Sequence, residues 1–97
     1  MATGIDAATD ARILSEVIAP ERPDFAPEVA RPILSLRFSE PQKSRMRELA
    51  ARNAEGTITE IERAEMESYR RVGNLLALLQ AKARLSLEHA QSDASAP

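Results

Sequence analysis

Apolar residues recur at helical spacing along most of this chain, and prolines and a glycine divide the pattern into segments. In residues 6–19 the apolar positions fall on one side of a helix, and Pro20 ends the run. These positions are Ile13, Leu14, Val17 and Ile18. The pattern predicts a short amphipathic helix over residues 6–19.

The stretch after the proline-rich connector has two interpretations. As a helix, residues 27–36 carry an apolar face, although Pro32 should kink or shorten it. As a strand, Leu34, Leu36 and Phe38 alternate with polar residues. We favour the helix, because a lone strand would have no partner in a sheet.

Capping residues mark two helix starts in the second half of the chain. A serine and a threonine each stand three residues before a glutamine or a glutamate, which is the spacing of a capping box. The pairs are Ser39 with Gln42 and Thr59 with Glu62. Gly56 suits the left-handed conformation that closes a helix. We therefore predict an antiparallel hairpin of helices over 40–54 and 59–90, joined by a short turn.

One apolar stripe follows the second predicted helix, and the two arms carry opposite charge. The stripe consists of Ile61, Ala64, Ser68, Val72, Leu75 and Leu79. The first arm has Lys43, Arg45, Arg47 and Arg52 against Glu48, and the second has Glu60, Glu62, Glu65 and Glu67 against Arg63. Each exposed pair contributes little. Together they favour this hairpin over misaligned pairings.

The two arms differ in length. At the usual rise per residue the first spans roughly 22 Å and the second roughly 45 Å, so the second runs free of the first beyond about Asn74. Its residues 72–87 are rich in leucine and too broadly apolar for a single stripe. Because a helix that is apolar on most sides is usually surrounded by protein, something other than the first arm must cover residues 72–87.

Two compatible kinds of cover are open for this segment. The N-terminal helix and residues 29–38 can fold back and complete a four-helix monomer, or another chain can dock there. Gly73 lies inside the long helix, where glycine costs about 1 kcal/mol relative to alanine. It is either a tolerated defect or a point of close approach by another helix.

Composition supports an all-α fold. At 97 residues the chain makes one small domain, and with 3% aromatic residues its core would be aliphatic, which suits packed helices. We predict a small helical bundle built on the long antiparallel helical hairpin, with one or two short N-terminal helices. The single domain would cover residues 6–90, with disordered ends at 1–5 and 91–97.

The chain offers little for catalysis. It has no cysteine, and its one histidine, His89, lies near the end of the long helix, where a positive side chain suits the helix dipole. No serine lies in a recognisable nucleophile elbow, and the glutamates of the second arm are better explained as a solvated face. We expect a protein that is not an enzyme and that uses no cofactor and no metal.

Charge and the N-terminal sequence bear on the protein's surroundings. The formal net charge of -2 argues against gross attraction to nucleic acid or to an anionic membrane. The first residues lack the basic start and apolar core of a signal peptide, and no apolar run reaches the length of a membrane span. We expect a soluble, cytoplasmic protein without a membrane partner.

From Phe25 to Arg84 the chain resembles a group of small bacterial helical-hairpin proteins of unassigned function. The most specific features are the Glu-Gly-Thr-Ile-Thr turn at residues 55–59 and the leucine-rich helix at residues 75–84. Some members are encoded beside an HNH-type endonuclease, so the resemblance implies one half of a two-protein module. It carries over no catalytic residue, and Pro32 departs from the helix former that the group tends to have there.

These observations lead to a hypothesis of protein binding. The long C-terminal helix would dock onto a partner protein or a second copy, for example as an antitoxin-like or chaperone-like inhibitor of a nuclease encoded nearby. Aliphatic anchors would supply affinity, and charges at the rim would set the register. The expected interface residues are Val72, Leu75, Leu76, Leu78, Leu79 and Ala83, with Lys82 and Arg84 at the rim.

Two alternatives stay open at this point. If residues 34–38 form a strand, the succession of strand, helix, turn and helix would resemble a ribbon-helix-helix repressor that regulates its own gene, with Ser35 and Arg37 facing DNA. The other alternative is a homo-oligomeric structural module.

Overall fold

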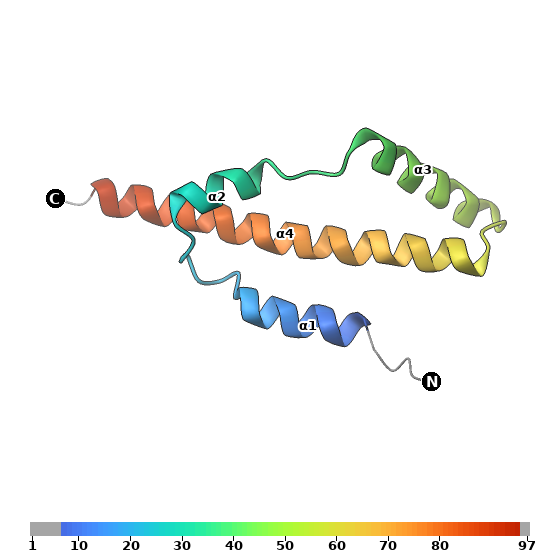
Figure 1. The fold of residues 1–97 in the computed structure, drawn as a ribbon, viewed down its shortest axis with the longest axis horizontal. Helices are drawn as coiled ribbons and strands as arrows, with labels where there is room; N and C mark the ends of the chain where they lie inside the picture. The colour runs from blue at the N-terminus through green and yellow to red at the C-terminus, as the bar shows by residue number, and fades with distance from the viewer. Residues whose placement is uncertain (1–6, 96–97) are drawn as a thin grey trace. The chain divides into compact units, whose positions relative to one another are not determined.

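The structure, a computed structural model, describes residues 7–95, and all of its regular secondary structure is α-helical (Figure 1). The helices are α1 (Ala7–Ile18), α2 (Pro27–Leu34), α3 (Glu40–Glu55) and α4 (Glu60–Ser95). Between residues 7 and 95 no residue lies in a strand. The predicted all-α class, with short N-terminal helices before a long hairpin, is confirmed.

The end of α4 differs from the prediction. The helix continues to Ser95, so residues 91–95, which we expected to be disordered, are helical. They contain neither proline nor glycine, so nothing in the sequence of these five residues stops the helix. The disordered ends expected at residues 1–5 and at the last two residues lie outside the described residues.

α2 ends two residues earlier than predicted, because the chain turns at Pro32 and Ser35. The backbone N–H and the hydroxyl of Ser35 both donate to the Pro32 carbonyl, at 3.1 and 2.7 Å. The Leu36 N–H donates to the Ile33 carbonyl at 3.1 Å. These bonds close the end of a helix, so Ser35 caps α2 and does not lie in a strand. The ribbon that the repressor alternative requires is not present in the described part of the chain.

The described chain divides into two compact units. The hairpin unit, residues 37–73, consists of α3 and the first part of α4. The arm unit combines residues 7–36 with residues 74–95, so that α1 and α2 pack with the rest of α4. The prediction of one domain over residues 6–90 did not anticipate this division.

The local signals of the hairpin unit are confirmed. Ser39 and Gln42 form both bonds of a capping box. At the start of α4, the Thr59 hydroxyl accepts from the Glu62 N–H at 3.1 Å, and the Glu62 carboxylate accepts from the Thr59 N–H at 3.0 Å. Gly56 closes α3 in the left-handed conformation, with φ of 76°.

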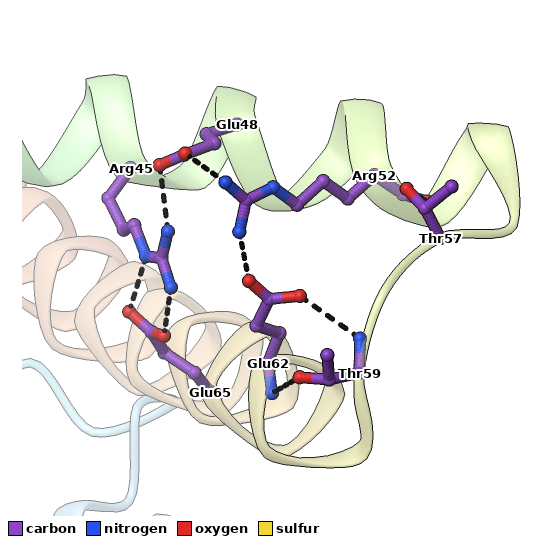
Figure 2. A network of polar contacts seen from close by, with 7 residues as sticks. All are labelled: Arg45, Glu48, Arg52, Thr57, Thr59, Glu62 and Glu65. Atoms are coloured by element: carbon purple, nitrogen blue, oxygen red, sulfur yellow. Dashed lines mark hydrogen bonds and ion pairs between the residues drawn. The ribbon is translucent and has the colours of Figure 1, made fainter.

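A layer of ion pairs joins the two helices of the hairpin, as Figure 2 shows. Arg45 donates two hydrogen bonds to Glu65, at 3.0 and 2.9 Å. Arg52 pairs with Glu62 and also reaches Glu48, at 2.6 Å. The predicted pairing of a basic arm with an acidic arm is therefore confirmed.

These contacts lower the pKa of two carboxyl groups. The hydrogen bonds from Arg45 hold the pKa of Glu65 below its ordinary value of 4.5. The pKa of Glu62 is lowered first by the bond from the Thr59 N–H and then by the charge of Arg52. Both carboxylates stay ionised to lower pH than they would in the unfolded chain.

Apolar contacts in the hairpin unit are few. Leu49 is the one apolar residue between residues 37 and 73 that is fully buried. The rings of Phe38 and Tyr69 meet edge to face, with centroids 5.9 Å apart. A Cβ atom added at Gly73 would lie 3.7 Å from the Phe38 ring, an ordinary distance. Within the hairpin unit, the nearest neighbour of Gly73 is thus an aromatic ring and not another helix.

α3 covers a different face of α4 from the one that the apolar stripe marks. Glu62 and Glu65 point toward α3 in Figure 2, and Tyr69 meets Phe38. Ile61, at the start of the stripe, is 83% exposed. The ion pairs and the aromatic contact select the face of α4 that α3 covers, and the first part of the stripe is left open.

Candidate protein-binding surface

A buried lysine of α4 holds the end of α1. Lys82 is only 5% exposed, and its ammonium group donates to the Ile18 carbonyl, the last of α1. The same group pairs with Asp24 at 2.6 Å and lies 4.6 Å from the centre of the Phe25 ring. The lysine therefore satisfies a carbonyl that a helix end leaves open, and its own charge is compensated by an acid and a ring.

The end of α1 needs such support. Ala19 follows the helix with φ of 51°, a left-handed conformation that is unfavourable for alanine by about 1 kcal/mol. Its N–H still donates to the Ser15 carbonyl at 2.9 Å. Pro20 comes next and cannot continue the helix. Lys82 thus stabilises the chain where it leaves α1 in an unfavourable conformation.

The neighbouring lysine changes the pKa of Asp24. The hydrogen bond from Lys82, followed by the attraction of the same ammonium group, lowers the pKa of Asp24 below its ordinary value of 3.8. The Asp24 side chain itself remains exposed. Solvent therefore screens this pair on the acid's side, and the Asp24 carboxylate stays ionised through the neutral range.

Two further polar side chains of α4 bind backbone groups of the N-terminal segments. The Gln80 amide donates to the carbonyls of Ile33 and Leu36, at 3.2 and 2.7 Å, and so caps the end of α2. The Ser86 hydroxyl accepts from the Phe25 N–H at 3.1 Å. We call Gln80, Lys82 and Ser86 the clasp, because each holds a different part of residues 18–36.

Small residues accompany the clasp. Ala30 of α2 and Ala83 of α4 are both fully buried, and Ser86 is almost so. Small side chains let backbones approach closely, which short bonds from side chain to backbone require. The chain's own N-terminal segments therefore cover the part of α4 around residues 80–86.

This cover changes the expected interface. Lys82, predicted at the rim, and Ala83, predicted as an anchor, are buried in the arm unit and are not open to a partner in this conformation. The reason is that the arm folds back on them. Leu75, Leu76, Leu78 and Leu79 are half-buried, whereas Arg84 and, in the hairpin unit, Val72 are exposed.

The most exposed large apolar side chain of the arm unit, Val17, lies elsewhere, on α1. Ile13, Leu14 and Val17 are all exposed, and Val17 is 74% exposed. Ile13 and Val17 are one turn apart and Leu14 adjoins them, so the three form one stripe, the α1 stripe. The sequence pattern places these residues, with Ile18, on one side of an amphipathic helix, and the structure leaves Ile13, Leu14 and Val17 exposed.

α1 buries a different face. Ala11, Ser15 and Ile18 are half-buried, and Ala19 beyond them is buried. A polar edge follows, where Arg12 pairs with Glu16 at 2.9 Å on the solvent side. α1 therefore has a packed face, a polar edge and an apolar stripe that stays exposed.

Neither a metal-binding cluster nor a membrane-spanning helix occurs between residues 7 and 95. No cluster of three or more histidine, aspartate or glutamate side chains is arranged to hold a metal ion there. Among these helices, none combines the length and apolar character that crossing a membrane requires.

Comparison with protein-family models, with curated proteins and with solved structures finds no match for this chain.

Proposed function

We propose that this protein is a non-enzymatic binding module that docks onto another protein through the α1 stripe. The observation that carries the proposal is the exposure of Ile13, Leu14 and Val17 on a helix whose opposite face is packed. Aliphatic side chains grouped on one helix face supply affinity when they enter an apolar groove.

The clasp contributes to this function by fixing α1. Lys82 holds the last carbonyl of α1 and, through Asp24, the connector that follows it. A helix held in place loses less conformational entropy on binding than a free one, so its stripe binds more tightly. The half-buried leucines of α4, at positions 75, 76, 78 and 79, still offer part of their surface to the same partner.

The partner we propose is a protein with an apolar groove, such as a nuclease that is held inactive or kept folded. The support for a nuclease is the resemblance of residues 55–59 and 75–84 to proteins that are sometimes encoded beside an endonuclease. Inhibition would then follow from occupation of the groove, and no catalytic residue of this chain would be needed.

The proposal is tested by substituting the most exposed residue of the stripe. Val17→Glu places a charge where an apolar contact would form, and it should abolish co-purification of the partner from native cells. Because Val17 is largely exposed in the free protein, the thermal midpoint should barely change.

Arg12→Glu is the matched control, since it adds the same side chain at an exposed position of α1 outside the stripe. It should keep the partner bound. If the two variants capture the same proteins in the same amounts as the unsubstituted chain, the α1 stripe is not the docking surface.

A further inference from the structure

One face of α4 in the hairpin unit is left uncovered by α3. Ile61, Ala64, Ser68 and Val72 follow one another at spacings of three and four, so they share a face. All four are exposed, and Ile61 is the most exposed large apolar residue of the described chain. We call these four residues the α4 face.

The hairpin unit has little core of its own. Leu49 is its one fully buried apolar residue between positions 37 and 73. Units of fewer than about 40 residues usually need oligomerisation or cross-links for stability. A second surface that buries Ile61 and Val72 would therefore add substantially to the apolar area that this unit removes from water.

The α4 face is complementary to itself in an antiparallel arrangement. The large residues, Ile61 and Val72, stand at its two ends, and the small ones, Ala64 and Ser68, stand between them. When two such faces meet head to tail, each Ile61 lies opposite a Val72 and each Ala64 opposite a Ser68. The small central residues allow the two helices to approach closely.

The charges at the edge of the face fit the same register. Glu60 and Arg71 are about three turns apart, so they lie on the same edge, roughly 16 Å from each other. That distance rules out an ion pair between them within one chain. In the antiparallel arrangement each Glu60 stands opposite an Arg71 of the other copy, and two-fold symmetry makes the pair occur twice.

We propose that the α4 face binds the α4 face of a second copy of this chain, antiparallel, with Glu60 opposite Arg71 of that copy. The occupant is a second copy because large residues meet large ones, small residues meet small ones and Glu60 meets Arg71, all in one register. Glu67, on the same edge near the centre, is paired with Arg70 of its own chain. Arg71, which now donates to the Ser68 hydroxyl at 3.2 Å, would turn toward Glu60 of the other copy. This surface lies in the hairpin unit, and its use does not depend on partner binding by the α1 stripe.

The dimer should be weak, because only four residues on each copy form its apolar part. Sedimentation equilibrium from about 1 µM to about 1 mM should show a reversible monomer–dimer equilibrium. Glu60→Arg and Arg71→Glu each create two repulsive pairs. Each variant should raise the dimer dissociation constant roughly tenfold.

Mixing the two variants gives the decisive measurement. A chain with Glu60→Arg carries two arginines at the edge, and a chain with Arg71→Glu carries two glutamates. In the antiparallel register their mixture restores both attractive pairs, so heterodimers should form with about the dissociation constant of the unsubstituted protein. A parallel arrangement would place each position opposite itself, so the unsubstituted protein would have two repulsive pairs. Its heterodimer would then bind more tightly than the unsubstituted homodimer, and neither single variant would weaken the dimer.

Control variants show whether a loss of the dimer is due to misfolding and whether the α1 stripe takes part in the dimer. Ala64→Glu, at the centre of the face, should abolish the dimer, whereas Ala51→Glu, at an exposed position of α3, should leave it intact with the same helical circular dichroism. Val17→Glu should also leave the dimer intact. A protein that stays monomeric at the highest concentration, or variants that do not complement each other in the mixture, would overturn the proposal.

Discussion

The two units of this protein use α4 in different ways. In the hairpin unit, charged side chains of α3 and α4 meet each other across a short turn, as Arg45 and Glu65 do. In the arm unit, polar side chains of α4 bind backbone groups far away in the sequence, as Lys82 does with the Ile18 carbonyl. The first kind of contact needs only two helices of opposite charge, and the second needs a particular backbone geometry.

This difference has energetic consequences. The ion pairs of the hairpin are partly exposed, so each contributes little and can be lost without leaving an unsatisfied group. The clasp is buried at Lys82 and Ser86, and removal of either side chain leaves a backbone group without its partner. We therefore expect substitutions to act more sharply in the clasp than in the ion-pair layer.

The largest expected effect is in the hairpin core. Leu49→Ala removes the one large apolar side chain that is fully buried between residues 7 and 95, and it should lower the free energy of unfolding by about 2–4 kcal/mol. Urea denaturation measures the change. Leu85→Ala, at a leucine of the arm unit that is 36% exposed, should cost less than about 1.5 kcal/mol. Equal losses would show that burial does not distinguish the two sites.

Substitution of the clasp lysine should come next. Lys82→Met keeps the length of the side chain but leaves the Ile18 carbonyl without its partner, a loss of about 1–3 kcal/mol. Hydrogen exchange should speed up in α1 and leave the amides of α3 unchanged. Arg84→Met, at an exposed neighbour, serves as the control. Faster exchange in both units alike would mean that the clasp does not act on the arm alone.

Substitution of Gly73 should have a smaller effect, and it should increase the stability of the protein. Gly73→Ala should stabilise α4 by about 0.5–1 kcal/mol, because alanine favours a helix and its Cβ atom would lie at an ordinary distance from Phe38. Thermal unfolding measures the gain. Gly56→Ala is the contrasting variant, since φ of 76° disfavours any side chain, and it should destabilise. A loss of stability at Gly73 would reveal a need for flexibility there.

Lowering the pH should destabilise the hairpin unit, by less than the substitutions described above change its stability. The pKa values of Glu62 and Glu65 are lowered by folding, so their stabilising effect is complete above the ordinary value of 4.5 and is lost as pH falls through the lower folded values. Hydrogen exchange between about pH 6 and about pH 3 should show α3 loosening. Arg45→Ala should flatten this dependence. If hydrogen exchange in the Arg45→Ala variant depends on pH as strongly as in the unsubstituted protein, the Arg45–Glu65 pair is not the cause.

Much of the hairpin could be predicted from the sequence, because its signals are local. The capping box of Ser39 with Gln42 and the left-handed Gly56 depend on residues a few positions apart. The charge pattern identified the partners of Arg45 and Arg52 as acids of the second arm, although not which acids. The apolar stripe did not show which face of α4 would meet α3, because apolar periodicity does not reveal the contact of Phe38 with Tyr69.

The candidate surface was less accessible to sequence reasoning. Lys82 looked like a rim residue because lysine is almost never fully buried unless it is paired. Its partners are a backbone carbonyl and an acid in a connector without regular secondary structure, and no sequence pattern signals such a contact. The α1 stripe was visible as a set of apolar residues, but not as an exposed one.

The sequence by itself determined the helices, their caps, the turn and the excess of leucine in the second half of α4. Hydrogen bonds within a few residues and the helical period fix these features wherever the segments lie. Only the tertiary structure decided that the arm covers residues 80–86 and that α1 and the first part of α4 keep apolar faces open. That arrangement depends on side chains of α4 that bind backbone groups far away in the sequence. Lys82 and Gln80 bind the ends of α1 and α2, and Ser86 binds the Phe25 N–H in the connector. These bonds form only once the arm has folded back.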